Sequence, residues 1–140
     1  SIVKPWRGIA MLREHEIQIR VRYQETDAQG HVHHANYLNY FEMGRIELFR
    51  AIGINYREFE ASGKMLVVSK IACRYCRPAR YDDLVTLKTT TTHIRRVRLE
   101  HHYELTRKDT LLVEGETTVA CVDQDGKVCR LPGFLRLEKD

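Results

Sequence analysis

The feature that most constrains the fold is the order in which hydrophobic periodicity changes along the chain. From residue 16 to 23, apolar and polar side chains alternate strictly, which is typical of a half-buried strand. From about 35 to 52, apolar residues recur every three or four positions, which predicts a helix that ends before Gly53. A second, short helix is expected at 56–61, and everything after it has the pattern of strands.

The strands expected in this second half are separated by turn-forming residues. We place them near 65–76, 84–94, 97–107 and 111–123, with a short hairpin return at 127–130. The order of one strand, one long helix and then consecutive strands predicts an α+β fold. In it, a long central helix packs on a roughly five-stranded antiparallel sheet. Residues 1–13 lack periodicity and are expected to form an arm ahead of a single domain over 14–140.

Composition sets wide limits on the partner. A chain of 140 residues can bury one substantial core without disulfides or metals. No apolar run approaches the ~20 residues that cross a bilayer, and the start of the sequence lacks a secretory apolar core, so a cytoplasmic location is expected. The net charge of +4 favours an anionic partner. A nucleotide-bearing cofactor, a nucleic acid and an acidic membrane surface all remain open on charge alone.

The polar loop between the first strand and the long helix carries the residues suited to chemistry. It presents Asp27, turns at Gly30, and reaches the helix near His34. The first N–H groups of a helix lack intrahelical partners and lie at the positive end of its dipole. Those N–H groups can stabilise an oxyanion, and Asp27 can act as a nucleophile or as a base for water.

Two other interpretations of the same loop stay open. Asp27 can be a helix cap or an Asx-turn residue without any catalytic role. His31, His33 and His34 can be metal ligands, but no nearby carboxylate or cysteine completes a typical zinc set. Solvated loop histidines are the commoner outcome, and no metal is expected.

The loop and the helix start resemble the motif of the 4-hydroxybenzoyl-CoA thioesterase family, a group of hotdog-fold acyl-CoA thioesterases. The residues that carry the resemblance are Asp27, Gly30, the run His34-Ala35-Asn36-Tyr37-Leu38 and the pair Phe41-Glu42. Residues 77–83 resemble the family's turn between the second and third strands. The similarity extends from about 16 to 130 and implies a single hotdog domain.

The resemblance also implies roles for individual residues in hydrolysis of an acyl-CoA thioester. Asp27 matches the catalytic aspartate, and the backbone N–H of His34 matches the donor that polarises the thioester carbonyl. Tyr23 matches a strand tyrosine that lines the site, and Gly30 lets the loop turn beside the substrate. No cofactor is implied, since coenzyme A is part of the substrate. The sequence departs from the family at Glu25, His31 and His33, which leaves the acyl preference open.

Coenzyme A is expected along the second and third strands. The resemblance places the pantetheine arm beside Val68, Ser69 and Lys70. It places the phosphates near the turn after the third strand, where Arg95, Arg96 and Arg98 cluster. Strand alternation would put Arg96 and Arg98 on one face and Arg95 on the other. The alternative is a solvated hairpin with ordinary surface charges.

The remaining expectations concern assembly, thiols and competing functions. A homodimer joined edge to edge is implied, and such dimers often pair into tetramers in the family. The four cysteines are expected to be reduced and buried. An acyl-thioester hydratase or dehydratase of the same fold would need a histidine paired with a carboxylate, for which His34 with Asp27 or Glu42 is the candidate. A basic module that binds nucleic acid is the other alternative, but the arginine cluster lacks interleaved aromatic residues, and no nucleic-acid partner is expected.

Overall fold

The computed structural model describes residues 13–135. Its elements follow in the order β1 (Glu14–Arg20), η1 (Tyr23–Glu25), α2 (Asn36–Ala51), α3 (Tyr56–Ala61), β2 (Met65–Tyr75), β3 (Leu84–Ile94), β4 (Arg98–Arg107), β5 (Thr110–Val122) and η2 (Gly133–Leu135). The two helices and the four later strands lie within two residues of their predicted bounds. Most of the predicted arm, residues 1–12, lies outside the described residues.

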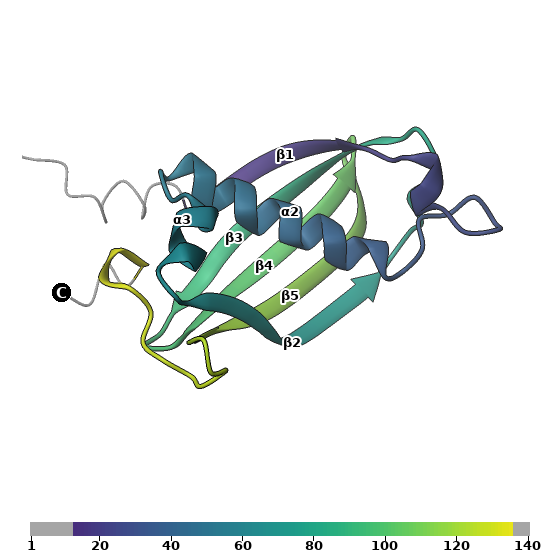
Figure 1. Cartoon of the computed structure of the whole chain (residues 1–140). Coiled ribbons are helices and arrows are strands. Elements are labelled where there is room, and N and C mark those ends of the chain that lie inside the picture. The colour runs from purple at the N-terminus through teal and green to yellow at the C-terminus, as the bar shows by residue number, and fades with distance from the viewer. Residues whose placement is uncertain (1–12, 136–140) are drawn as a thin grey trace, which may run out of the picture.

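The five strands form one antiparallel sheet in the order β1-β3-β4-β5-β2. Helix α2 lies across one face of this sheet, and the strands curve around it (Figure 1). Strands β1 and β2 are the two edges, although they flank the helix in sequence. The expected α+β fold, one long helix on a five-stranded antiparallel sheet, is therefore confirmed.

The first strand ends earlier than its hydrophobic alternation predicts. Val21 lies just beyond β1, and its N–H donates to the Asp83 carbonyl in the turn between β2 and β3, at 2.9 Å. The chain then tightens into η1, because the Glu25 carboxylate accepts a hydrogen bond from the Arg22 N–H at 2.9 Å. The placement of Tyr23 on a strand was therefore wrong, since Tyr23 is the first residue of a 3-10 turn.

Helix α2 packs closely on the sheet at Gly44. A Cβ added there would lie 2.8 Å from Leu87 Cδ2 and closer still to the Thr89 hydroxyl on β3. The residues that α2 buries are Tyr37, Tyr40, Phe41, Gly44, Leu48 and Phe49. A glycine inside a helix costs roughly 1 kcal/mol in helix propensity, and the close approach to β3 explains why one is present.

The C-terminal segment closes the core at the far end of α2. The predicted hairpin return at 127–130 is reduced to an isolated bridge between Val122 and Val128. Leu131 and Leu135 are nevertheless buried in the same apolar cluster as Phe49. All four cysteines are free, as expected. The expectation of burial is wrong for Cys76, which is exposed because it follows the end of edge strand β2.

His101 on β4 is buried in the core without hydrogen bonds. Its side chain is 1% exposed, and neither ring nitrogen has a partner among the described residues. Burial, together with the nearby Arg45, lowers the pKa of His101 to about 3. The unfolded chain takes up this proton below about pH 6.5, whereas the folded chain does not.

The free energy of unfolding should therefore fall as pH drops from about 6.5 towards 3. The expected slope from this one group is about 1.4 kcal/mol per pH unit. Urea unfolding between pH 6.5 and 5 measures it, in a range above the titration of the carboxylates. His101→Phe should lose this part of the slope, and an unchanged slope in that variant would contradict the assignment.

Candidate active site

The loop between η1 and α2 is a closed, hydrogen-bonded turn. Thr26 and Val32 form an antiparallel bridge that brings the two ends of the loop together. The Asp27 N–H donates to the His31 carbonyl at 2.7 Å, and the Gly30 N–H donates to the Asp27 carbonyl at 3.0 Å. Gly30 has a φ of 79°, which favours glycine because it has no Cβ. The tight turn expected at Gly30 is present.

Asp27 is an exposed carboxylate with one oxygen held and one free. Its Oδ1 accepts hydrogen bonds from the N–H groups of Gln29 at 2.8 Å and His31 at 3.1 Å. Its Oδ2 accepts none from the residues that the structure describes. The Gln29 hydrogen bond, helped by that from His31, holds the pKa of the Asp27 carboxyl below its ordinary value. Asp27 is therefore ionised at neutral pH and presents one oxygen to solvent.

The same turn occurs once more in the chain, after β5. Asp123 Oδ1 accepts from the N–H groups of Asp125 and Lys127 at 2.9 and 3.0 Å, and the Gly126 N–H donates to the Asp123 carbonyl. The Asx turn is thus a structural unit found at two places within residues 13–135. What distinguishes the Asp27 copy is the segment that follows it, which leads into α2 rather than into the C-terminal segment.

Helix α2 begins two residues after His34, whose backbone N–H is the predicted oxyanion donor. Its first residue is Asn36, Ala35 is the N-cap, and His34 lies in the turn before it. The N–H groups of His33 and Asn36 are bonded, to the carbonyls of Glu25 and His33 at 2.9 and 2.8 Å. The His34 N–H donates to no acceptor within residues 13–135. The His34 N–H, which the resemblance implies as the donor to the thioester carbonyl, is therefore the N–H in this turn that has no acceptor among the described residues.

Glu25 anchors the loop to helix α2 through hydrogen bonds. Its carboxylate accepts hydrogen bonds from the Tyr40 hydroxyl at 2.7 Å and from the Arg22 N–H, and its carbonyl accepts from the Asn36 side chain. Burial raises the pKa of Glu25, but these hydrogen bonds and the charge of Arg22 outweigh it and leave the pKa below its ordinary value. A buried, ionised Glu25 therefore ties the loop to the first turns of α2.

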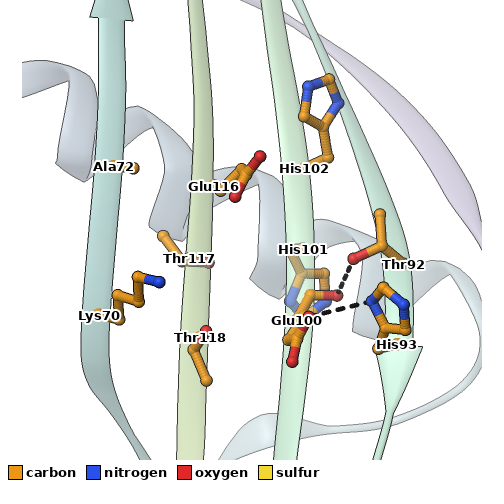
Figure 2. Close-up of a pocket in the computed structure, with 10 residues that line it drawn as sticks. All are labelled: Lys70, Ala72, Thr92, His93, Glu100, His101, His102, Glu116, Thr117 and Thr118. Atoms are coloured by element: carbon orange, nitrogen blue, oxygen red, sulfur yellow. Dashed lines mark hydrogen bonds and ion pairs between the residues drawn. The ribbon is translucent and has the colours of Figure 1, made fainter.

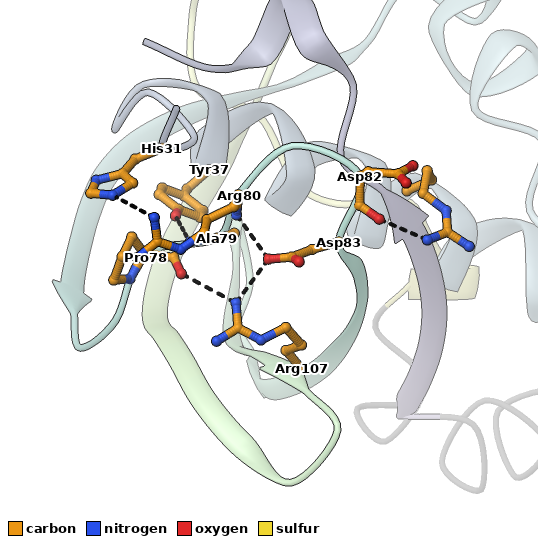
Figure 3. A network of polar contacts seen from close by, with 9 residues as sticks. His31, Tyr37, Pro78, Ala79, Arg80, Asp82, Asp83 and Arg107 are labelled. Atoms are coloured by element: carbon orange, nitrogen blue, oxygen red, sulfur yellow. Dashed lines mark hydrogen bonds and ion pairs between the residues drawn. The ribbon is translucent and has the colours of Figure 1, made fainter. Parts of the chain in front are cut away.

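The turn between β2 and β3 holds the other side of the loop (Figure 3). The Val32 N–H donates to the Ala79 carbonyl at 2.8 Å, and the His31 ring contacts the Arg80 guanidinium at 3.2 Å. The turn is itself fixed by Asp83, which bonds Arg107 at 2.8 Å. His31 thus packs on this turn. Sequence reasoning missed Arg80 in this role, because nothing in its spacing indicates a contact 49 residues away.

Tyr75 on β2 is a second residue that sequence reasoning missed. Its ring stacks on the His34 imidazole, with centroids 4.1 Å apart and planes 16° apart. Tyr23, by contrast, is 76% exposed and contacts the ring of Tyr81 edge-on. The expected role of Tyr23 in lining the site stays a prediction.

The predicted pantetheine strand is an irregular edge. The pairing of β2 with β5 shifts register between Val68 and Lys70, so Ser69 lies in a β-bulge and its hydroxyl contacts the Thr118 carbonyl at 3.3 Å. Several large apolar side chains along β2 are exposed, namely Met65, Val67, Val68, Ile71 and Tyr75. An edge with free backbone groups and apolar side chains is a surface for pairing.

The predicted phosphate-binding arginines lie at the β3–β4 hairpin. Arg95 is engaged by Glu100 at 2.8 Å, whereas Arg96 and Arg98 are exposed and form no ion pair with a described residue. Residues 95–97 form the turn itself. Strand alternation therefore does not apply to Arg95 and Arg96, which are not on a strand, and the predicted faces of the three arginines stay a prediction.

A groove of about 270 Å³ lies on the face of the sheet away from α2 (Figure 2). Its lining is polar, with Lys70 from β2, His102 from β4 and Glu116 from β5. Of the predicted site residues, Lys70 alone lines it. His102, Glu104 and Glu114 have potential metal-ligand atoms within 4.8 Å of one another, but the His102 ring and the Glu114 carboxylate are already hydrogen-bonded to each other at 3.0 Å. No residue of the Asp27 loop lines the groove, so the groove is separate from that loop.

The comparisons with known proteins bear on this geometry. A family model described as the thioesterase-like superfamily matches residues 21–137. The chain belongs to this superfamily. It is also 36% identical over 106 residues to an Escherichia coli protein named acyl-CoA thioester hydrolase YbgC, covering 75% of this chain and 79% of the relative. The expected family and the expected class of enzyme, a thioester hydrolase, are thus confirmed.

Two further members of the superfamily extend the comparison. A Staphylococcus aureus structure titled DHNA-CoA thioesterase superposes with a TM-score of 0.82 at 30% identity, over 84% of this chain and 80% of that one. An Arabidopsis thaliana protein named acyl-acyl carrier protein thioesterase ATL3 is 30% identical over 132 residues, covering 92% of this chain and 69% of that one. The hotdog fold is confirmed by the structural match, while the carriers named in these relatives differ. No helix within residues 13–135 is long and apolar enough to cross a membrane.

Proposed function

We propose that this chain hydrolyses an acyl-coenzyme A thioester to the free acid and coenzyme A, with Asp27 as the catalytic carboxylate. The observation that carries the proposal is that one loop holds both an ionised Asp27 with a free Oδ2 and a His34 N–H without an acceptor among the described residues. Membership of the thioesterase-like superfamily supports it. Relatives named acyl-CoA thioester hydrolases support coenzyme A as the carrier.

The proposed chemistry needs few groups. A thiol leaves readily, because its pKa is about 8.5, so no strong general acid is required to expel it. The His34 N–H stabilises negative charge on the carbonyl oxygen as the tetrahedral intermediate forms. In one route Asp27 attacks the carbonyl carbon, the carbon–sulfur bond breaks to release the coenzyme A thiolate, and water then hydrolyses the resulting acyl–aspartyl anhydride. In the other route Asp27 takes a proton from a water that attacks the carbonyl carbon, and the same carbon–sulfur bond breaks. The reaction requires no cofactor, and the substrate supplies the coenzyme A.

The exposed arginines Arg96 and Arg98 are proposed to bind the phosphates of coenzyme A. Phosphate contacts far from the carbonyl stabilise ground state and transition state equally. Paired substitution Arg96→Gln and Arg98→Gln should therefore raise KM for acyl-CoA about tenfold and leave kcat within about twofold. Steady-state rates with acyl-CoA and with acyl-pantetheine measure this. The truncated substrate lacks the phosphates, so equal sensitivity of both substrates would place these arginines elsewhere.

We also propose a homodimer joined through edge strand β2. An unpaired edge with exposed Val67, Val68, Ile71 and Tyr75 is the kind of surface that proteins cover. Two copies related by a two-fold axis would continue the sheet from β2 to β2 and complete the wall beside each His34–Tyr75 pair. Pairing of dimers into tetramers is compatible with this arrangement.

The competing hydratase activity requires a histidine paired with a carboxylate. No hydrogen bond joins His34 to Asp27 or Glu42 within the described part of the chain, and the His34 ring faces Tyr75 instead. This contact favours thioester hydrolysis over hydration.

A substrate panel tests the proposed function. Saturated and aromatic acyl-CoA substrates, with the same acyl groups on acyl carrier protein, are assayed with a thiol-trapping dye. Enoyl-CoA is followed by loss of its conjugated absorbance. Hydrolysis predicts thiol release from acyl-CoA and no hydration. Hydration of enoyl-CoA without thiol release would contradict the proposal, and release from acyl carrier protein alone would change the carrier.

A further inference from the structure

We infer that Tyr75 is a positioning residue for the oxyanion donor, because its ring fixes the orientation of the His34 peptide. The inference rests on the proposed function, since it concerns the same site. Tyr75 is the last residue of β2, so a residue of the proposed dimer edge would also affect catalysis.

Hydrogen bonds hold most of the loop but leave His34 weakly tethered. The N–H groups of Asp27, Gly30, His31, Val32 and His33 all find acceptors between 2.7 and 3.1 Å. His34 differs, because its N–H has no acceptor among the described residues and its ring forms no hydrogen bond there. Its carbonyl accepts from the Tyr37 N–H and the Tyr75 hydroxyl at the long distances of 3.3 and 3.5 Å. The peptide unit that carries the His34 N–H is held at its other end, where the His33 carbonyl accepts from the Asn36 N–H at 2.8 Å, while His34 itself has only the two long contacts.

The stacked Tyr75 ring supplies a second restraint, on the His34 side of that peptide unit. The centroid distance of 4.1 Å and the near-parallel planes put the whole His34 imidazole against Tyr75. His34 is otherwise exposed, so this contact limits its rotation. Aromatic pairs of this kind contribute roughly 0.5–1.5 kcal/mol beyond area burial.

Tyr75 is itself rigidly placed and can serve as a fixed support. Its backbone pairs with Val113 of β5, and its ring lies 5.5 Å from the buried ring of Tyr37. Burial, together with the neighbouring Cys73, raises the pKa of Tyr75 to about 12. Tyr75 therefore stays a neutral aromatic ring at working pH. Removing the ring should leave the His33–His34 peptide held through the His33 carbonyl alone and let the His34 N–H tilt. A misdirected oxyanion donor costs turnover rather than substrate affinity.

Kinetics of Tyr75→Leu and Tyr75→Phe test the inference. Tyr75→Phe keeps the stacked ring and should retain at least half of the wild-type kcat. Tyr75→Leu removes the ring and should lower kcat at least tenfold, with KM within about twofold of wild type. Val128→Ala is the control, because Val128 is an exposed apolar residue that lies outside β2 and outside the proposed site. The control should leave kcat within about twofold.

Proton NMR gives a readout that does not depend on activity. The His34 ring protons, assigned with His34→Gln, should be shifted upfield by the Tyr75 ring in wild type and Tyr75→Phe and should return to random-coil positions in Tyr75→Leu. The inference is overturned if Tyr75→Leu keeps more than half of kcat, if Tyr75→Phe loses as much as Tyr75→Leu, if KM alone changes, or if the upfield shift is absent in wild type. If Asp27→Asn also stays active, the proposed function itself fails. If Asp27→Asn is inactive while Tyr75→Leu is not, the positioning role alone fails.

Discussion

Asp27→Asn should retain less than a tenth of wild-type turnover in thioester hydrolysis, while its fold and its coenzyme A binding remain close to wild type. The amide keeps the shape of the carboxylate and its Oδ1 can still accept the hydrogen bonds from Gln29 and His31. It is neither a nucleophile nor a useful base. Steady-state kcat with an acyl-CoA substrate measures the loss, and thermal unfolding reports on the fold.

The chain contains a closely matched control for this substitution. Asp123, which follows β5, caps the same D-x-x-G turn and accepts the same two backbone hydrogen bonds. Asp123→Asn should therefore change turnover by less than about twofold, although it perturbs an equivalent turn. Equal losses in the two variants, or more than a tenth of activity in Asp27→Asn, would show that Asp27 acts only as a turn residue.

Ile71→Glu should dissociate the proposed dimer and abolish activity with it. The substitution puts a charge on an exposed apolar position of edge strand β2, where the second sheet would pair. Light scattering should fall from twice 16.5 kDa to the monomer mass of 16.5 kDa. Activity should be lost because the proposed dimer completes the wall beside each His34–Tyr75 pair.

Val128→Glu provides the comparison for the edge strand. Val128 is 61% exposed and lies outside β2, so its substitution adds the same charge elsewhere on the surface. It should leave both mass and activity unchanged. A fully active wild-type monomer at 16.5 kDa would contradict the proposed assembly.

The sequence predicts the elements well because each one carries its own periodicity. Alternation over 84–94 and 97–107 and the three-to-four spacing over 35–52 depend only on which face is buried, and α2, β3 and β4 follow closely. The prediction fails at Tyr23, where the apolar alternation continues but Glu25 captures the Arg22 N–H and ends the strand. A side-chain hydrogen bond of this kind leaves no mark in a hydrophobic pattern.

The candidate site was predicted in part, for a similar reason. Asp27, Gly30 and His34 are close in sequence, so their order fixes their proximity on one loop. Tyr75 and Arg80 reach the same loop from β2 and from the turn after it. Their contacts depend on strand order β1-β3-β4-β5-β2, which periodicity does not contain. The Asx turns at Asp27 and Asp123 have the same local sequence pattern and the same hydrogen bonds. Local sequence therefore does not separate the two, and the difference between them is that α2 follows Asp27.

The most direct test of the central claim is mass spectrometry of the products formed from one acyl-CoA in ¹⁸O-labelled water. Hydrolysis at the acyl–sulfur bond predicts free coenzyme A and carboxylic acid in equal amounts, with one ¹⁸O in the acid, and loss of both products in Asp27→Asn. An intact thioester, or an enoyl-CoA substrate that gains labelled water while its acyl–sulfur bond survives, would contradict the account.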